Sequence, residues 1–229
     1  MNIAVVIPAL NEEGPLPLVL RDLAPLLANG SLQRVILVDN GSTDNTAQVA
    51  REGGAEVVPQ PQRGYGSACL AGFAHLAQDP PDVVVILDAD HSDYVEDLAL
   101  LVEPIEKGQA DMVLGERTTL AERGALLPNQ VFGNKLATAL IRVHTGHRYR
   151  DMGPFRAIRW TSLMAMEMED PAFGWNVEMQ MKAIQRGLVV REVAVRYRTR
   201  VGTSKISGTI KGTVKAGIGI LRATWRYRS

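Results

Sequence analysis

The sequence predicts an α/β fold in which helices cover both faces of a mostly parallel sheet. In the first half of the chain, short β-branched runs alternate with segments of helical spacing, as in repeated strand–helix–strand units. The run 83–86 is apolar throughout, as strands buried on both faces are. The 229 residues, 46% hydrophobic and 22% charged, suffice for one large globular domain.

The first 145 residues contain five expected strands and five expected helices. Apolar runs predict strands at 2–7, 34–38, 55–58, 83–87 and 110–114. Apolar residues at helical spacing predict helices near 14–28, 42–52, 66–78, 94–107 and 129–144. Ser42, Thr43 and Asp44 offer an N-cap and an acidic first turn to the second of these helices.

After residue 145 the strand–helix alternation becomes irregular. A strand is expected at 154–159, a helix at 174–186 that ends at Gly187, and strand structure within 189–197. The single Cys69 cannot form an intrachain disulfide, and residues 1–8 resemble a strand more than a signal peptide. A cytoplasmic setting is therefore expected, with one domain at 1–206 and a tail at 207–229.

The tail differs from the rest of the chain in charge. The chain has 25 basic and 25 acidic residues, but nine basic and no acidic residues lie from Val193 onward. Helical spacing over 207–228 gathers basic and apolar residues into adjacent stripes, a pattern typical of helices on anionic membranes. An alternative is that the apolar stripe packs on the domain. The stripes contain Lys211, Lys215, Arg222 and Arg226, and Ile210, Val214, Ile218, Leu221 and Trp225.

Two aspartates follow the apolar run 83–86. Asp88 and Asp90, separated by Ala89, lie at the carboxyl end of the expected strand, where open α/β sheets bind their ligands. Paired carboxylates can hold a hard divalent cation such as Mg²⁺ or Mn²⁺, and that cation can hold a diphosphate.

Three further loops are expected at the same edge of the sheet. In chain order the four loops are the first (8–13), the second (39–44), the third (62–67) and the fourth (88–93). Acids in such loops can accept hydrogen bonds from a ribose or a base. Gly64 and Gly66 allow the backbone to approach a ligand closely. Each loop alone is explained equally well by a helix cap or a turn, but the four together are much more specific.

The four loops resemble those of the family 2 glycosyltransferases, which have the Rossmann-like GT-A fold. Residues 6–13 are similar to the opening strand and donor loop, 38–44 to an Asp-Asp-Gly-Ser-Thr-Asp motif with Asn40 at the second acid, and 88–90 to the metal-binding Asp-x-Asp. Segments 115–117, 151–156, 174–178 and 200–205 resemble the polyprenyl-phosphate mannosyl- and glucosyltransferase branch. Ser92 stands where that branch often has Gln, which puts the choice of metal in doubt.

The resemblance implies inverting transfer of a hexose from a UDP- or GDP-linked donor to a polyprenyl phosphate at the cytosolic membrane face. It implies a donor half at 1–115 and an acceptor half at 116–206. Asp90 and Asp88 would bind the metal. The donor residues would be Pro8, Ala9, Asn11, Glu12, Asp39, Asn40, Gly64, Gly66, Asp88, Ala89 and Asp90. The catalytic and acceptor residues would be Asp90, Arg117, Arg156, Arg200 and Lys205, with Asp151 as base if the acceptor is a hydroxyl.

Other functions are weighed against this one. The same donor could serve a soluble or glycan hydroxyl acceptor, or the chain could be a nucleotide-sugar binding module without catalysis. A dinucleotide-binding oxidoreductase is disfavoured because no Gly-x-Gly-x-x-Gly follows the first strand. A sugar nucleotidyltransferase is disfavoured because the first loop lacks a glycine-rich, basic diphosphate cradle. No nucleic-acid partner is expected.

Overall fold

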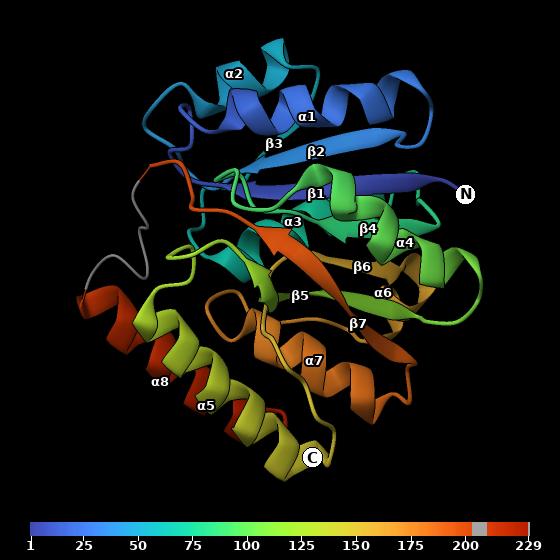
Figure 1. Ribbon diagram of the computed structural model, residues 1–229. Coiled ribbons are helices and arrows are strands. Elements are labelled where there is room, and N and C mark those ends of the chain that lie inside the picture. The colour runs from blue at the N-terminus through green and yellow to red at the C-terminus, as the bar shows by residue number, and fades with distance from the viewer. Residues whose placement is uncertain (203–209, 229) are drawn as a thin grey trace.

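The computed structural model describes residues 1–202 and 210–228, with the backbone alone for 210–216. Its centre is a seven-stranded sheet in the order β3-β2-β1-β4-β6-β5-β7, in which only β6 runs antiparallel to its neighbours (Figure 1). The strands are β1 (Ile3–Ala9), β2 (Arg34–Asp39), β3 (Glu56–Pro59), β4 (Val83–Ile86), β5 (Met112–Ala121), β6 (Arg156–Arg159) and β7 (Val190–Tyr197). The predicted fold class, mostly parallel α/β with a C-terminal helix, is confirmed.

Helices cover both faces of the sheet. One apolar core lies between the sheet and α1 (Leu16–Ala28), α2 (Thr46–Glu52) and α4 (Leu98–Glu106), which follows the 3₁₀ turn η1 (Val95–Asp97). The second core packs against α3 (Tyr65–Leu76), α6 (Trp160–Ala165) and α7 (Trp175–Gln185). Helices α5 (Pro128–Thr145) and α8 (Ile210–Arg226) lie side by side and both pack on α7 (Figure 1).

Two element boundaries differ from the predicted ones for local reasons. Helix α2 begins at Thr46 and not at Ser42, because residues 42–45 bind the first loop instead. Ser42 Oγ accepts a hydrogen bond from the Asn11 N–H (2.9 Å), and Asp44 Oδ2 accepts one from the Glu13 N–H (3.3 Å). Strand β5 runs past the predicted end at 114 because it pairs with β7 as far as Tyr197.

Helix α6 is absent from the sequence prediction. Its six residues are too few to display a helical period. The helix forms because Trp160 and Leu163 are buried in the second core directly after β6. No helix in the described parts of the chain, 1–202 and 210–228, is both long and apolar enough to cross a membrane.

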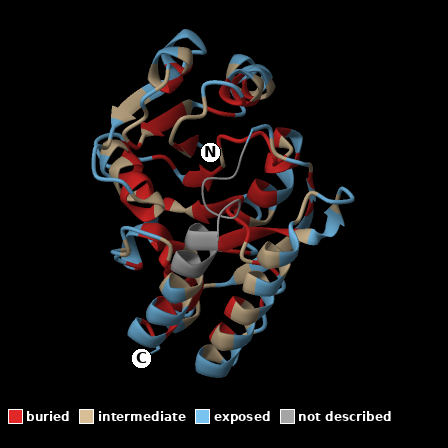
Figure 2. Ribbon diagram, turned by 90° about the vertical axis from the view of Figure 1, so that its left-hand side faces the viewer, coloured by how far each residue is buried: buried red, intermediate tan, exposed pale blue. Residues whose placement is uncertain are grey.

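In the described end of α8, the residues of the predicted apolar stripe face solvent. Ile218, Leu221 and Trp225 are 44%, 51% and 68% exposed, whereas Ala223 and Tyr227 are buried against the body (Figure 2). The apolar stripe therefore does not pack on the domain in this part of the helix. Lys205 and the start of the predicted tail lie outside the described residues.

Candidate active site

A hollow of about 490 Å³ opens at the carboxyl ends of β1 and β4. Parallel strands bring these ends to one edge of the sheet, which is where the sequence predicts a ligand site. Its wall is formed by the four loops that follow strands and by residues 172–173. Arg200 closes one side. The lining includes Pro8, Ala9, Glu12, Asn40, Gly64, Tyr65, Asp88, Ala89, Asp90, Phe173 and Arg200.

Asp88 and Asp90 stand at the base of this hollow. The Tyr65 hydroxyl donates a hydrogen bond to Asp88 Oδ1 (3.3 Å). Burial, reinforced by the neighbouring Asp90 charge, raises the pKa of Asp88 to about 7. Asp90 is only 4% exposed, and its Oδ1 accepts hydrogen bonds from the backbone and hydroxyl of Ser92. The turn thus holds two carboxylates close together at the strand end.

The donor set of this turn fits a hard divalent cation. Carboxylate oxygens are the ligands that Mg²⁺ and Mn²⁺ favour, and a cation would offset the repulsion between Asp88 and Asp90. Among the described residues, no cluster of three or more His, Cys, Asp or Glu side chains is arranged to hold a metal. The two aspartates therefore suit a cation that takes its other ligands from water and from a diphosphate.

Asp93 is a third carboxylate at this turn that sequence reasoning missed as a site residue. It is 2% exposed, and both carboxylate oxygens lack a hydrogen-bond partner. Burial, followed by the charges of Asp88 and Asp90, raises its pKa well above the ordinary value. The only sequence signal was its place in the loop 88–93, because burial without a partner cannot be read from residue order.

Arg200 is the cation that faces these carboxylates. Its Nη1 lies 3.2 Å from Asp90 Oδ2, and its Nη2 lies 3.7 Å from Glu12 Oε1. The segment that carries it is pinned to the fourth loop, because the Arg198 N–H donates to the Ser92 carbonyl and the Val201 N–H to the Asp90 carbonyl. Arg200 is the predicted acceptor residue that the structure brings into the hollow.

Contacts among four side chains hold that segment in place. The Arg198 guanidinium donates from Nε to the His91 carbonyl (2.7 Å) and stacks 4.3 Å from the Tyr94 ring centre. His91 Nε2 lies 2.8 Å from Asp22 Oδ2 on α1. His91 has a left-handed backbone (φ 59°), which a non-glycine residue rarely adopts, so the fourth loop is fixed by these contacts.

The first two loops bind each other through side chains that the sequence assigns to the donor. Asn11 Oδ1 accepts the Thr43 N–H (2.7 Å), so this oxygen fastens loop to loop, and Asn11 does not line the hollow. Asp39 also lies outside the lining, and its Oδ1 accepts the Ser42 N–H (3.0 Å). Pro8, Ala9 and Glu12 do line it.

The third loop is held by Asn40 and by two glycines. Asn40 Nδ2 donates to the carbonyls of Gln60 and Gln62, and Oδ1 accepts the Gly64 N–H, so the side chain is engaged within the loop. A Cβ at Gly64 would lie 2.1 Å from the Pro171 carbonyl oxygen, and one at Gly66 would lie 1.9 Å from that of Asp170. The close approach at both glycines is made by the chain's own backbone.

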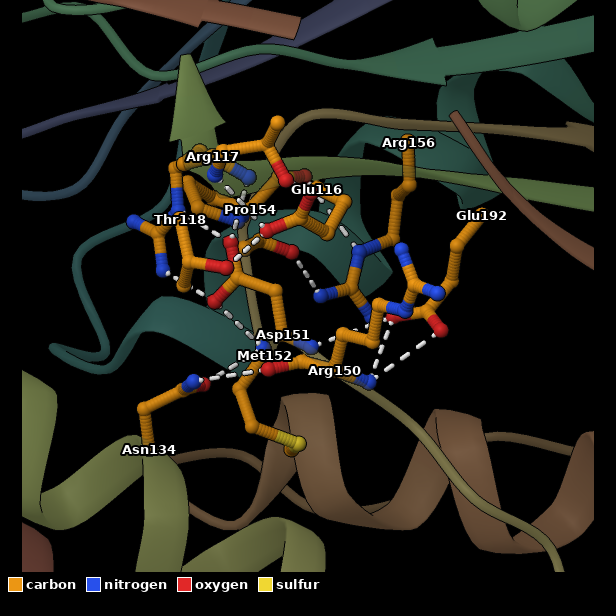
Figure 3. Close-up of polar contacts among 12 residues, drawn as sticks. Glu116, Arg117, Thr118, Asn134, Arg150, Asp151, Met152, Pro154, Arg156 and Glu192 are labelled. Atoms are coloured by element: carbon orange, nitrogen blue, oxygen red, sulfur yellow. Dashed lines mark hydrogen bonds and ion pairs between the residues drawn. The ribbon is translucent and has the colours of Figure 1, made fainter. Parts of the chain in front are cut away.

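Arg117 and Asp151 form a buried ion pair (Figure 3). Neither residue lines the hollow. Arg117 donates from Nε (2.7 Å) and Nη2 (2.8 Å) to the two Asp151 oxygens, and its backbone N–H donates to one of them (2.9 Å). Asp151 is 1% exposed. Asp151, predicted as the base for a hydroxyl acceptor, has both oxygens engaged by Arg117 and by the Met152 N–H. The guanidinium of Arg117 likewise donates its hydrogen bonds to Asp151.

Arg156 is the second predicted phosphate-binding residue that does not reach the hollow. Its side chain is fully buried, and the guanidinium donates to the carbonyls of Gly153 and Pro154 beside the Met179 sulfur. Burial lowers its pKa from the ordinary value. A lipid phosphate cannot contact it without displacement of the 153–154 backbone.

Comparison with known proteins agrees with this geometry. The profile of the family described as Glycosyl transferase family 2 matches residues 4–159. The chain belongs to glycosyltransferase family 2. This family 2 chain is 39% identical over 219 residues to an uncharacterized glycosyltransferase of Mycobacterium tuberculosis, which covers 93% of this chain and 94% of the relative.

Two further similarities concern a curated relative and a solved structure. A dolichyl-phosphate hexose transferase of Haloferax volcanii is 34% identical over 206 residues, covering 90% of this chain and 86% of that protein. The structure of glucosyl-3-phosphoglycerate synthase from M. tuberculosis with Mn²⁺ and UDP-glucose has a TM-score of 0.76 at 23% identity, covering 99% and 78% of the two chains. That structural likeness supports the GT-A fold alone.

Proposed function

We propose that this glycosyltransferase transfers a hexose, with inversion, from a UDP- or GDP-linked donor to a polyprenyl phosphate at the cytosolic face of a membrane. One observation carries the proposal. Arg200 sets a guanidinium 3.2 Å from Asp90 in the wall of the hollow, beside the carboxylates that fit a cation. An acceptor phosphate bound there by a guanidinium fork would lie next to the donor's diphosphate. The dolichyl-phosphate hexose transferase that resembles the chain supports this acceptor class.

The donor would occupy the hollow, most of whose lining comes from the first half of the chain, 1–115. Pro8, Ala9 and Glu12 would contact the base and ribose, and Asp88 and Asp90 would hold Mg²⁺ or Mn²⁺. When bound, that ion supplies positive charge to the departing diphosphate. Residues 116–206 would supply the acceptor side, through Arg200 in the described part of the chain.

The acceptor is inferred from the chemistry that the site offers. A phosphate acceptor arrives as an anion and needs little proton removal, whereas a hydroxyl acceptor requires a general base. The sequence offers Asp151 for that role, but Arg117 occupies its oxygens. Inversion at the anomeric carbon then follows from direct attack by a phosphate oxygen, with Arg200 orienting the acceptor and neutralising its charge.

A radiolabel assay tests this function. Purified protein with Mn²⁺ or Mg²⁺ receives labelled UDP- or GDP-hexoses together with undecaprenyl or dolichyl phosphate, and label is counted in the organic extract. We expect label in that extract with one donor and no label without the lipid. Label on a soluble acceptor alone would establish the alternative hydroxyl or glycan acceptor. Binding of donor without transfer to any acceptor would establish a binding module.

The outward face of α5 supports a membrane location. Phe132 and Val143 are 71% and 78% exposed, with half-buried Leu136 and exposed Ala139 between them at helical spacing. Neither α5 nor the parallel helix α8 contains an acidic residue. Exposed apolar groups on two helices whose own charges are all basic match an anionic bilayer, whereas a second copy would bring these like charges together.

Replacing Phe132 on α5 or Trp225 on α8 with glutamate is expected to weaken membrane binding about tenfold. Each change removes apolar area that the bilayer would bury and adds repulsion from anionic lipid. The variants are Phe132→Glu and Trp225→Glu, measured by co-flotation with vesicles that contain phosphatidylglycerol. Val189→Glu is the matched control, since Val189 is 54% exposed just before β7. Equal flotation of all four proteins would contradict the membrane location.

A further inference from the structure

A second hollow lies between the loop 170–174 and helix α8. Its volume is about 420 Å³, and Ala172, Phe173, Ile218, Gly219 and Ala223 form most of its apolar lining. Ala172 and Phe173 also line the donor hollow. The two hollows therefore share a wall, and the second one extends from that wall to Ile218 on the exposed apolar face of α8.

Small residues on α8 create this groove. Gly219 and Ala223 lie one turn apart and face the loop. A Cβ on Gly219 would lie 3.1 Å from the Phe173 Cβ, so any larger side chain there would enter the groove. At the other end, a Cβ on Gly174 would lie 2.7 Å from the Ala223 Cβ, which shows how closely loop and helix approach.

The groove is apolar at its floor and carries its polar groups at the rim. Asp170 Oδ1 accepts the Ala172 N–H (2.8 Å), and Arg226 pairs with Glu169 (3.1 Å) outside the floor. Arg222 completes the rim with a second guanidinium. A sugar or nucleotide would leave its polar groups without partners on such a floor. A linear hydrocarbon chain attached to an anionic head fits both parts.

We infer that this groove binds the first isoprene units of the lipid acceptor. The assignment rests on the proposed function, which requires a polyprenyl phosphate at the shared wall. The phosphate would lie on the active-site side of Phe173, and the chain would pass along Gly219 and Ala223 toward Ile218. From there it reaches the exposed apolar surface of α8, where the rest of a long chain can enter the bilayer.

The test fills the groove and measures how activity depends on chain length. Gly219→Leu places a side chain against Phe173, whereas Gly217→Leu is the matched control, because a Cβ on Gly217 meets nothing within 4 Å. Both variants replace glycine by leucine in the same helix. Acceptors are isoprenyl phosphates of one, two, four and eleven units, with initial rates measured in one detergent.

The wild-type protein and Gly217→Leu should show a KM that falls as the chain grows from one to four units. Gly219→Leu should lose that dependence, with a KM for the longer acceptors raised at least tenfold relative to the Gly217→Leu control. An identical chain-length dependence in all three proteins would overturn the groove assignment alone. No transfer by the wild type to any isoprenyl phosphate would overturn the proposed function and this assignment with it.

Discussion

Replacing Asp90 with asparagine is expected to lower kcat by about 10²–10³-fold, the loss typical of removing one group that stabilises charge in the transition state. Asp90 is the residue on which the cation site, the Ser92 contacts and the Arg200 pair converge. Asparagine keeps the shape and can still accept the Ser92 N–H, but it removes the charge that a divalent cation requires. The fold should survive, because the change also relieves repulsion from Asp88 and Asp93.

Two measurements separate this effect from misfolding. The first is the transfer rate with labelled donor. The second is thermal stabilisation by UDP or GDP with and without Mn²⁺, since at a fixed concentration a ligand of higher affinity stabilises the fold more. Asp90→Asn should lose the Mn²⁺-dependent part of the stabilisation. Wild-type turnover together with an intact Mn²⁺ effect would exclude Asp90 as a cation ligand.

Asp88→Asn serves as the companion variant, because the sequence leaves Asp88 open to a ribose or a metal role. If Asp88 contacts the ribose, its asparagine variant should bind nucleotide more weakly at every cation concentration, while the added stabilisation by Mn²⁺ persists. If it is a metal ligand, the two variants should behave alike. The pair of experiments thus assigns both aspartates.

The sheet and the strand-end turn were predictable because both depend on short-range sequence. Buried parallel strands require continuous apolar runs such as 83–86, and the order of those runs brings their following loops to one edge. The Asp88–Asp90 turn needs no more than its position after such a run. For the same reason, the loops that follow β1 and β4 lie in one hollow as expected.

Partners distant in sequence were not predictable from the motifs. Arg117 and Asp151 are 34 residues apart and both resemble acceptor residues, yet the antiparallel insertion of β6 brings them together as a closed pair. Arg156 begins β6, whose place between β4 and β5 determines that its side chain is buried. The sequence predicts ligand contacts at Gly64 and Gly66. The packing of 170–171 against both glycines is a tertiary contact, which residue order does not reveal.

The Arg117–Asp151 pair gives the second large expectation. Asp151→Asn should lower the free energy of unfolding by about 3–5 kcal/mol, because Arg117 is left charged and buried without its carboxylate. Arg117 is only 12% exposed on its side chain, so water cannot replace the lost partner. The double variant Arg117→Met with Asp151→Asn should lose less than the sum of the two single changes, since it removes the unpaired charge.

The pH dependence of stability identifies the pair as the cause. Burial would raise the pKa of Asp151, but the hydrogen bonds and charge of Arg117 outweigh it and hold that pKa below its ordinary value. The carboxylate therefore stabilises the fold fully above its unfolded pKa of about 3.9, and this contribution is lost as the pH falls through the lower folded pKa. Urea unfolding between pH 3 and pH 7 should show a steeper acid loss in the wild type than in Asp151→Asn. Equal loss of stability with falling pH in the two proteins would mean that Arg117 does not hold Asp151 ionised. The same would follow if Asp151→Asn were as stable as the wild type. Either result would make Asp151 a candidate catalytic base again.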